Sequence, residues 1–384
     1  MKILVITPYK SMIGGANRSL LMVLKGLKNE YKQDLLVVVP AEGVFSEALK
    51  ENGIAYTTAP IHEVGGLYGK GLKPFLRKVK LNLLAAKDRK GGKAFAKSLQ
   101  EKFDLVYIND NSTYFGSVVA RALKIPYVWH FRSLVNPDVY YNTDAFDAFE
   151  KCTRLIAISD GMQALIEQTR YVPKGKTVRI HNGIPLEDAE KSGQSRENSF
   201  HFIQCGRITP DKGQMDAITA LGMLKEKGIR DIYLHIVGAV PEGHAAYKES
   251  LEAKVKELGL EEQVIFEGTR NDLPFFRADM NGELMCSVCE PFGRVTLEGM
   301  RSGLVVIGSD TGGTPEIITD NETGLLYRQG SAADLAEKIR MVYEDETLAK
   351  RLADAAYEFS RTHFTPETNV KAIYEVLEQA VKEK

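Results

Sequence analysis

The sequence lacks the features that mark several specialised classes of protein. Fifty basic and fifty-one acidic residues leave a net charge of −1, so the positive excess of a nucleic-acid-binding protein is missing. No apolar run reaches the length of about 18 residues that a membrane-spanning helix needs. The first ten residues, MKILVITPYK, lack the cleavage site of a signal peptide. With 384 residues, 44% of them hydrophobic, we expect a cytoplasmic globular protein of two or three domains.

Cysteine is scarce, with four residues in the chain. Three of them, Cys152, Cys205 and Cys286, lie in apolar, strand-like segments, which is typical of reduced and buried thiols. Cys286 and Cys289 form a C-x-x-C pair, which a redox site or half of a zinc site could use. A zinc site needs about four ligands and no second pair occurs, so the pattern favours core residues.

Short apolar runs alternate with longer amphipathic segments along the chain. The runs are continuously apolar, which is typical of parallel strands buried on both faces. In the first half they are Ile3–Ile6, Leu35–Val39, Leu105–Ile108, Tyr127–Trp129 and Leu155–Ile158. They resume after a polar stretch as Phe200–Ile203, Tyr233–Val237, Val264–Phe266, Leu284–Cys286 and Val305–Ile307. Helical patterns fall between them, as at residues 16–29 and 112–123, and only helices are expected after residue 331.

Two such series predict an α/β protein with two Rossmann-like, doubly wound domains. We place the domains at residues 1–183 and 184–364, with a linker near residues 183–199 and a terminal helix at residues 365–384. Ligands bind at the carboxyl ends of the strands in open α/β sheets. The function is therefore to be sought in the loops that follow the strands, on the two sides of a cleft between the domains.

The first such loop contains Gly14 and Gly15, directly after the first predicted strand. Adjacent glycines allow close approach of a ligand, and the helix that they open offers N–H groups to an anion. A double glycine is also common in a plain tight turn. No G-x-G-x-x-G or Walker motif occurs, which disfavours the standard dinucleotide-binding and P-loop folds.

The second loop, Cys205–Gly213, carries Arg207 and Lys212 at the start of a helix that Thr209 or Asp211 could cap. Two cations at a helix N-terminus suit a diphosphate. The alternative is an exposed loop whose charges are simply solvated.

The third loop has the strongest pattern. Glu290 and Glu298 lie eight positions apart across a strand-to-helix junction, with Gly293 at the expected start of the helix. The backbone N–H groups of residues 293–295 would face outward as anion donors. A fourth loop, Asp310–Glu316, again has paired glycines, and Thr314 is expected to cap a helix before Pro315.

Taken together, these motifs resemble the retaining GT-B glycosyltransferases of the family-four type, also called glycosyl transferases group 1. The resemblance extends over almost the whole chain, through the tandem halves, the Gly14–Gly15 loop and His130. The motifs that carry it are Gly206-Arg207 with Lys212-Gly213, Glu290-Pro291-Phe292-Gly293 with Glu298, Gly312-Gly313-x-Pro315-Glu316 and Gly324-Leu325-Leu326. It implies a GT-B fold in which the terminal helix crosses back to the first domain, and a nucleotide-sugar donor held mainly by the second domain.

The resemblance also implies roles for individual residues. Arg207 and Lys212 would neutralise the donor diphosphate, Glu290 would bind sugar hydroxyls and Glu298 would bind the ribose. His130 would lie near the reacting carbon, where it would orient the donor or act as a base; a histidine beside an aromatic strand is otherwise most often structural. The implied donor site comprises Gly14, Gly15, Gly206, Arg207, Lys212, Thr269, Arg270 (the last two beside the base), Glu290, Phe292, Gly293, Arg294, Val295 and Glu298.

The chain departs from the family pattern at two positions. Gly299 follows Glu298 where the family more often has alanine, which weakens the helix by about 1 kcal/mol. Arg294 stands where an aliphatic residue is common, which predicts a different donor preference.

The expected chemistry is transfer of a sugar from a nucleotide-sugar, most simply a UDP-sugar, to a glycan or lipid-linked acceptor. By resemblance, transfer retains the anomeric configuration and the departing phosphate helps to deprotonate the acceptor; Glu290 as a covalent nucleophile ranks second. Cations and N–H dipoles at the leaving diphosphate stabilise such a transition state. We expect no metal and no cofactor, because no Asp-x-Asp triplet occurs and Arg207 and Lys212 would supply the positive charge.

Residues 70–102 form a basic segment with eleven Lys or Arg and two acids, Asp88 and Glu101. Apolar residues lie between the charges. This pattern predicts either a solvated pair of amphipathic helices or a surface that docks on anionic lipid at the inner face of the cell membrane.

Other functions suit the same architecture. A sugar-nucleotide 2-epimerase or hydrolase would share the fold, and a phosphorylase would need a pyridoxal lysine that the sequence does not single out. A non-catalytic, two-domain sugar-binding protein is the alternative outside enzymes.

Overall fold

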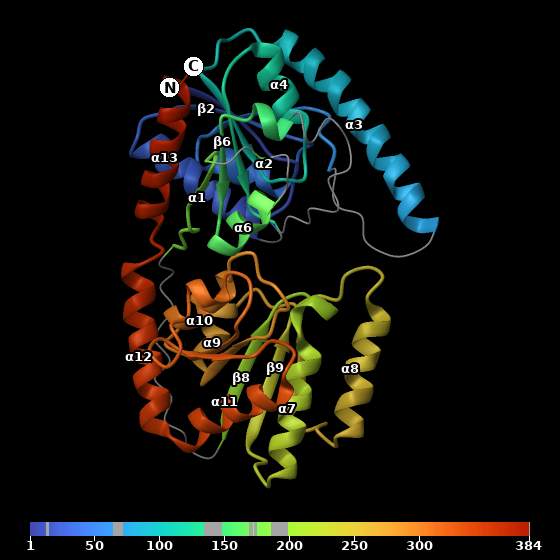
Figure 1. Cartoon of the computed structure of the whole chain (residues 1–384), viewed down its shortest axis with the longest axis vertical. Coiled ribbons are helices and arrows are strands. Elements are labelled where there is room, and N and C mark those ends of the chain that lie inside the picture. Colours follow the sequence, from blue (N-terminus) through green and yellow to red (C-terminus); the bar gives the residue numbers. More distant parts are fainter. Residues whose placement is uncertain are drawn as a thin grey trace. The chain divides into compact units, whose positions relative to one another are not determined.

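The structure is a computed structural model that describes residues 1–12, 15–63, 72–133 (side chains from residue 79), 148–168, 172, 175–185 and 199–383. The chain divides into two compact units, shown in Figure 1. Unit 1 consists of residues Met1–Gly183 and Pro366–Lys384, and unit 2 of residues Ile184–Thr365. Gly14 and most of the polar stretch near residues 183–199 lie outside the described residues.

Unit 1 is built on a parallel sheet of seven strands in the order β3-β2-β1-β4-β5-β6-β7. Its central strands are buried along their whole length because helices cover both faces. The strands are β1 (Lys2–Ile6), β2 (Asp34–Val39), β3 (Ala55–Thr58), β4 (Leu105–Asn109), β5 (Tyr127–Phe131), β6 (Arg154–Ala157) and β7 (Thr177–Arg179). The described helices are α1 (Gly15–Asn29), α2 (Val44–Glu51), α3 (Leu72–Ser98), α4 (Phe115–Leu123), α6 (Asp160–Gln168) and α13 (Pro366–Lys382).

The terminal helix α13 packs in unit 1 against α1, as Figure 1 also shows. The rings of Tyr31 and Tyr374 stack with their centroids 4.2 Å apart. Gly26 of α1 leaves room for Val370 of α13, because a Cβ at Gly26 would lie 2.6 Å from a Val370 methyl carbon. The buried apolar stripe of α13 thus belongs to the core of unit 1.

Unit 2 is built on a parallel sheet of six strands in the order β10-β9-β8-β11-β12-β13. The strands are β8 (Phe200–Cys205), β9 (Ile232–Val237), β10 (Val264–Gly268), β11 (Gly282–Met285), β12 (Val305–Ser309) and β13 (Leu325–Tyr327). The helices are α7 (Gln214–Glu226), α8 (Ala245–Glu257), α9 (Leu273–Ala278), α10 (Arg294–Arg301), α11 (Ala332–Glu344) and α12 (Glu346–Thr362), with 3-10 turns at Pro210–Lys212 and Thr314–Glu316.

Within the basic segment at residues 70–102, Leu72–Ser98 form one continuous helix, α3, so the expected pair of helices is wrong. Ala85, Gly92 and Ala96 are buried, and the bare backbone of Gly92 lets Val118 of α4 approach closely. Asp88 is also buried, and its carboxylate accepts hydrogen bonds from the backbone N–H and the ring of His62. The helix α3 is therefore continuous, and one of its sides packs against α4.

Among the described residues, none of the helices combines the length and apolar character of a membrane span.

Candidate active site

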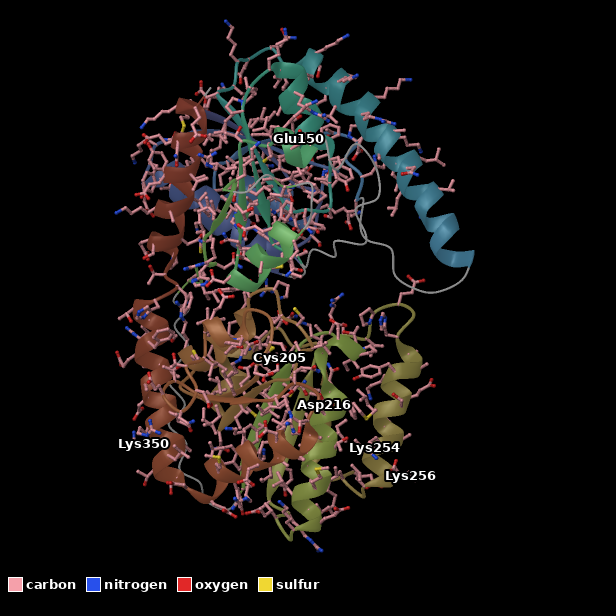
Figure 2. The ribbon with its side chains drawn as sticks, in the orientation of Figure 1. Glu150, Cys205, Asp216, Lys254, Lys256 and Lys350 are labelled. Atoms are coloured by element: carbon pink, nitrogen blue, oxygen red, sulfur yellow. The ribbon has the colours of Figure 1, made fainter. Side chains whose placement is uncertain are left out.

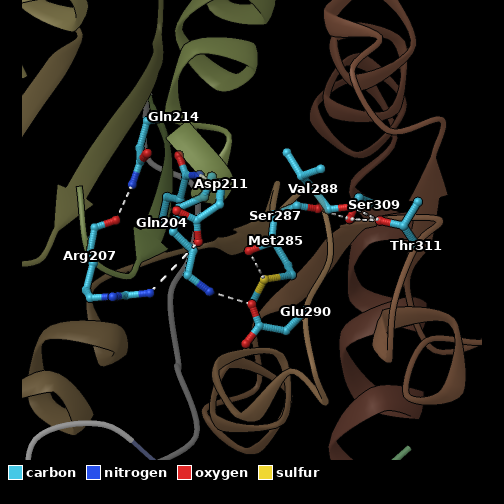
Figure 3. A network of polar contacts seen from close by, with 11 residues as sticks. Gln204, Arg207, Asp211, Gln214, Met285, Ser287, Val288, Glu290, Ser309 and Thr311 are labelled. Atoms are coloured by element: carbon cyan, nitrogen blue, oxygen red, sulfur yellow. Dashed lines mark hydrogen bonds and ion pairs between the residues drawn. The ribbon is translucent and has the colours of Figure 1, made fainter. Parts of the chain in front are cut away.

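Three loops of unit 2 meet at the carboxyl edge of its sheet. They follow β8, β11 and β12, which are adjacent in the sheet, and backbone hydrogen bonds tie them together. The Val288 N–H donates to the Asp211 carbonyl at 2.9 Å, and the Gly313 N–H donates to the Glu290 carbonyl at 2.8 Å. The Thr311 hydroxyl donates to the Val288 carbonyl at 2.8 Å, as Figure 3 shows. The loops thus form one connected structure.

Two glycines allow this close packing. Gly213 has φ +66°, and a Cβ there would lie 2.0 Å from the Cys286 carbonyl oxygen. Gly312 has φ +61°, and its Cβ would lie 2.4 Å from the Glu290 carbonyl oxygen. Side chains other than hydrogen are excluded at both positions.

The ion pair between Lys212 and Glu290 lies where the loops meet. Lys212 Nζ donates to Glu290 Oε2 at 2.6 Å, and the two side chains are 19% and 17% exposed. Gln204 fixes the Lys212 backbone by donating from its amide to the Lys212 carbonyl at 2.9 Å. Gly206 lies beside the methylene groups of Lys212. The arrangement places a cation and a carboxylate next to each other in a partly desolvated position.

Arg207, the other predicted cation, does not join this pair. Its side chain is 66% exposed and its guanidinium lies 3.9 Å from the Asp211 carboxylate. Figure 3 shows Arg207 pointing toward Asp211. An exposed ion pair of this kind contributes at most about 1 kcal/mol, so Arg207 can exchange Asp211 for an anion at small cost.

The expected helix caps are wrong in both loops. Thr209 precedes a 3-10 turn without a side-chain cap, and α7 begins only after Gly213. In the fourth loop Thr314 lies inside a 3-10 turn that starts after Gly313. Gly213 takes the N-cap position of α7, and Gly313 that of the 3-10 turn in the fourth loop, because a Cβ at either position would strike backbone atoms.

Helix α10 begins as predicted, with Gly293 as N-cap at φ +103°. Arg294 and Val295 form its first turn. Phe292 is buried at 2% exposure, with its ring edge-on to Phe364 at 5.6 Å, so its side chain is part of the core. Any contact of Phe292 with a ligand would have to come from its backbone.

Glu298, in the second turn of α10, is held by a buried arginine. Arg277 of α9 donates from Nη2 to Glu298 Oε2 at 3.2 Å and from Nε to Glu283 Oε2 at 2.9 Å. Arg277 and Glu283 are 4% and 1% exposed. Burial raises the pKa of the Glu283 carboxyl to about 6, against the opposing effect of Arg277. Glu298, with Arg277 and Pro274, also lines a small surface pocket.

The buried Glu283 explains the unusual glycine after Glu298. A Cβ at Gly299 would lie 2.4 Å from Glu283 Oε2 and 3.0 Å from Glu283 Cβ. Arg277 holds that carboxylate with two nitrogens, so it cannot move away cheaply. The absence of a side chain at Gly299 thus leaves the space that the buried Glu283 carboxylate of β11 occupies.

Thr269 and Arg270 follow β10, and Arg270 belongs to a separate polar cluster. Thr269 is exposed. Arg270 pairs with Glu267 at 3.1 Å and with Asp272 at 2.8 Å, and its guanidinium lies 4.0 Å from the centre of the Phe276 ring. These contacts present Arg270 in one orientation beside the end of β10.

In unit 1, Gly15 begins α1, and His130 is fully buried at the end of β5. His130 Nδ1 lies 2.6 Å from the Tyr107 hydroxyl. Burial, with the nearby Arg132 guanidinium, holds the pKa of His130 well below its usual range. The imidazole is therefore neutral at physiological pH.

The sequence reasoning missed a polar cluster around His130. Asn109 and Asp110 follow the apolar run of β4, and Arg132 follows that of β5. Asp110 accepts hydrogen bonds from the backbone N–H groups of Arg132 and Ser133 at 2.9 and 3.1 Å. Polar residues directly after continuous apolar strands are the signal that could have identified this cluster.

The glycine at position 299 yields a stability prediction. Gly299→Ala should destabilise the protein by about 1–3 kcal/mol through overpacking against Glu283. Gly91→Ala in α3 is the matched control, because its Cβ would meet only ordinary contacts at 3.5 and 3.6 Å. The control should gain up to about 1 kcal/mol of helix propensity. Urea denaturation measures both, and stabilisation by Gly299→Ala would contradict the explanation.

Two family models match the chain in succession. The model described as Glycosyltransferase Family 4 matches residues 13–188. The model described as Glycosyl transferases group 1 matches residues 187–359.

Curated relatives match over part of their length. The lipopolysaccharide core biosynthesis glycosyltransferase LpsD of Rhizobium meliloti is 29% identical over 49% of this chain and 52% of its own length. The N-acetylgalactosamine-N,N'-diacetylbacillosaminyl-diphospho-undecaprenol 4-alpha-N-acetylgalactosaminyltransferase of Campylobacter jejuni is 26% identical over 74% of this chain and 77% of its own length. The chain thus spans about half the length of the first relative.

Solved structures match nearly end to end. HepE of Anabaena, in complex with UDP and glucose, has a TM-score of 0.79 at 25% identity and covers 98% of this chain and 99% of its own. Sucrose-phosphate synthase of Thermosynechococcus elongatus, at 18% identity and a TM-score of 0.78, shares the fold over the full length of both chains. Since the two family models together extend over most of the chain, the protein belongs to the GT-B glycosyltransferases, with a Glycosyltransferase Family 4 half followed by a Glycosyl transferases group 1 half.

Proposed function

We propose that this chain transfers a sugar, with retention of anomeric configuration, from a UDP-sugar to a glycan or lipid-linked acceptor in the synthesis of a cell-surface polysaccharide or glycolipid. The Lys212–Glu290 pair carries the proposal, because it joins a cation to a hydroxyl-binding carboxylate at 2.6 Å where three loops meet. HepE binds UDP and glucose, and UDP-glucose in a second structure. The relatives' names refer to lipopolysaccharide core synthesis and to a diphospho-undecaprenol acceptor.

In this proposal the diphosphate of the donor replaces Glu290 as a partner of Lys212. The freed Glu290 carboxylate then accepts hydrogen bonds from sugar hydroxyls. Arg207 would leave Asp211 and add a second cation, because its present ion pair is exposed and weak. Glu298 would accept from the ribose hydroxyls while Arg277 holds its other side.

The positive charges would act on the leaving group. Cleavage of the sugar–phosphate bond transfers its electron pair to the diphosphate, and a preorganised cation is most effective where such charge develops. Lys212 and Arg207 would fill this role without a metal or a cofactor.

We also propose that the reaction takes place in the cytoplasm.

Binding of UDP to the Lys212 site gives the first functional prediction. At 100 times its dissociation constant UDP should stabilise the protein by about 2.7 kcal/mol, a shift of a few degrees in melting temperature. Lys212→Ala should weaken UDP binding by about 10- to 100-fold, because a charge-assisted hydrogen bond is lost. Arg207→Ala should weaken it less. Thermal melting against UDP, GDP, ADP, CMP and dTDP measures the effect.

The control for this experiment is Lys350→Ala, which removes an exposed lysine on α12 (Figure 2). It should leave the UDP shift unchanged. A folded protein that responds to none of the five nucleotides would reject the donor site and favour the non-catalytic sugar-binding protein.

Product analysis tests the reaction itself. With UDP-glucose, whose glucose is α-linked, and an alkyl glycoside acceptor, the product should be the α-glycoside, identified by its anomeric proton coupling in NMR. EDTA should leave the rate unchanged, since Lys212 and Arg207 would supply the charge. A β-linked product would contradict retention, and a rate restored only by magnesium or manganese would contradict metal independence. Free sugar formed regardless of acceptor would indicate a hydrolase.

We also propose that α3 docks on anionic lipid and brings the enzyme to lipid-linked acceptors. The described side of α3 that faces away from α4 carries exposed Lys87, Lys90 and Lys93. Val79 and Leu83 on the same helix are 44% and 61% exposed. Exposed lysines together with apolar side chains on one helix suit a negatively charged membrane surface.

Vesicle flotation measures this docking. The chain should float with vesicles that contain phosphatidylglycerol at low salt and dissociate at high salt, because the attraction is electrostatic. Reversing Lys87, Lys90 and Lys93 to glutamate should abolish flotation. Lys254→Glu with Lys256→Glu on α8 (Figure 2) is a control for charge reversal outside α3 and should still float. Equal flotation of both charge-reversed variants would refute docking through α3.

A further inference from the structure

The chain passes between the two units at two places, and the second passage contains a strained residue. Unit 2 begins at Ile184 and ends at Thr365. Phe364, one residue before that end, has φ +54°, which lies in the left-handed region that residues with large side chains avoid. Among the described residues it is the only aromatic residue with a positive φ. Such a conformation persists only where the surrounding contacts hold it.

Hydrogen bonds to the Phe364 carbonyl hold this residue and join the two passages. We refer to residues 184–185 and 360–365 as the crossing segments. The Ile184 N–H donates to the Phe364 carbonyl at 3.0 Å, and Arg301 Nη2 donates to the same oxygen at 3.4 Å. The first residue of unit 2 is thus bonded directly to the strained residue near its end.

Arg301, the last residue of α10, binds both crossing segments with one guanidinium. Its Nη1 donates to the Ile184 and Pro185 carbonyls, to the latter at 2.7 Å. Its Nη2 donates to the Ser360 carbonyl at 2.9 Å. Ser360 lies in the last turn of α12, where carbonyls lack partners within the helix and a cation is favourable. Arg301 is 7% exposed, and its planar, forked guanidinium can donate to several carbonyls at once, which a lysine does less well.

The crossing segments also contact the candidate donor site. The Phe364 ring lies edge-on to the Phe292 ring at 5.6 Å, and Phe292 directly precedes Gly293, the N-cap of α10. Ile184 lines the same small surface pocket as Glu298. Helix α10 is therefore fastened to the crossing segments near its N-terminal end by an aromatic contact and at its C-terminal end by its last residue.

We infer that Arg301 is a positioning residue for donor binding, which fastens α10 to the crossing segments and thereby sets the position of Glu298 and of the N–H groups of residues 293–295. The inference rests on the proposed function for the identity of the ligand. Arg301 acts through Phe364 and Phe292 and not by contact with the donor. Coupling between two sites is reciprocal, so a donor that binds better when α10 is fastened must strengthen the fastening in turn.

Hydrogen exchange at the Ile184 amide measures the fastening without any ligand. Selective ¹⁵N-isoleucine labelling, with Ile184→Val for assignment, identifies the signal. Arg301→Met keeps an aliphatic stem and removes every donor, so exchange at Ile184 should become faster by about 10-fold or more. Arg301→Lys, the milder variant, should have a smaller effect. Unchanged exchange at Ile184 in Arg301→Met would overturn the fastening.

The conformation of Phe364 is tested by a comparison of alanine with glycine. Phe364→Gly should melt at a higher temperature than Phe364→Ala, because glycine tolerates a positive φ and alanine does not. The neighbouring His363 has φ −103°, so the same two substitutions at that position should leave alanine at least as stable as glycine. A Phe364→Ala variant as stable as Phe364→Gly would overturn the inference that contacts hold this residue in a strained conformation.

The positioning role is tested by the split between KM and kcat. Arg301→Met should raise KM for UDP-glucose and weaken UDP binding by about 5- to 100-fold, the usual range of coupling between two sites. The change in kcat should be smaller, because the position of α10 affects binding of the donor in the ground state. Ile339→Ala, which truncates a fully buried side chain of α11, is the control for lost stability. It should lower the melting temperature without raising KM. Unchanged KM in Arg301→Met, or an equal rise in Ile339→Ala, would overturn the role.

A last measurement separates the two hypotheses. In the wild type, saturating UDP should slow exchange at Ile184 by the same factor by which Arg301→Met weakens UDP binding. If the wild type binds UDP without any change in exchange at Ile184, the positioning role is rejected and the proposed function stands. If the wild type neither binds UDP nor turns over UDP-glucose, the proposed function fails and the positioning role with it, while exchange in Arg301→Met still decides whether Arg301 fastens the crossing segments.

Discussion

The arrangement of the candidate donor site depends on the ion pair between Lys212 and Glu290. The two residues are 78 positions apart and come from loops after different strands, yet their charged atoms lie 2.6 Å apart. The loops approach this closely because Gly213 and Gly312 lack side chains at points where a Cβ would strike backbone atoms. A partly buried ion pair also balances its own charge, so each partner is held in place until a ligand offers an equivalent one.

Each unit contains a buried arginine, and the side-chain partners of the two arginines differ. In unit 2, Arg277 is compensated by Glu283 and Glu298, and the buried cluster holds one oxygen of Glu298 while leaving its side chain 24% exposed. In unit 1, the guanidinium of Arg132 donates to the amide oxygens of Asn109 and Asn182, while the buried Asp110 carboxylate accepts from the Arg132 backbone N–H. Arg277 therefore fixes the position of carboxylates, and Arg132 fixes the orientation of two side-chain amides. The chemistry of each cluster follows from this difference.

The sequence predicted the interior of the fold better than its edges. Continuous apolar runs identified β1, β2, β4, β5 and β6 because strands covered on both faces have no exposed side. The missed strands, β3, β7 and β13, all lie at sheet edges. Ala55–Thr58 has no buried residue, so no apolar pattern could mark it. The predicted helix caps were wrong for a related reason. Thr209 and Thr314 were predicted as caps from local sequence preference, whereas contacts between loops distant in sequence determine the backbone there.

The sequence predicted those parts of the candidate site that depend on residues close together in the chain. It did not predict the parts that depend on contacts between residues far apart in the chain. Gly293 is the N-cap of the helix that carries Glu298, so their spacing in the sequence predicted the start of that helix correctly. Arg207 and Lys212 looked equivalent in sequence, but only Lys212 pairs with Glu290, through a contact that no local pattern encodes. Gly299 is the clearest case: local propensity treats it as a weakness in α10, whereas Glu283 in β11 requires it. The departure of Gly299 from its family's pattern is explained by its spatial neighbour Glu283, and this pair has to be considered together.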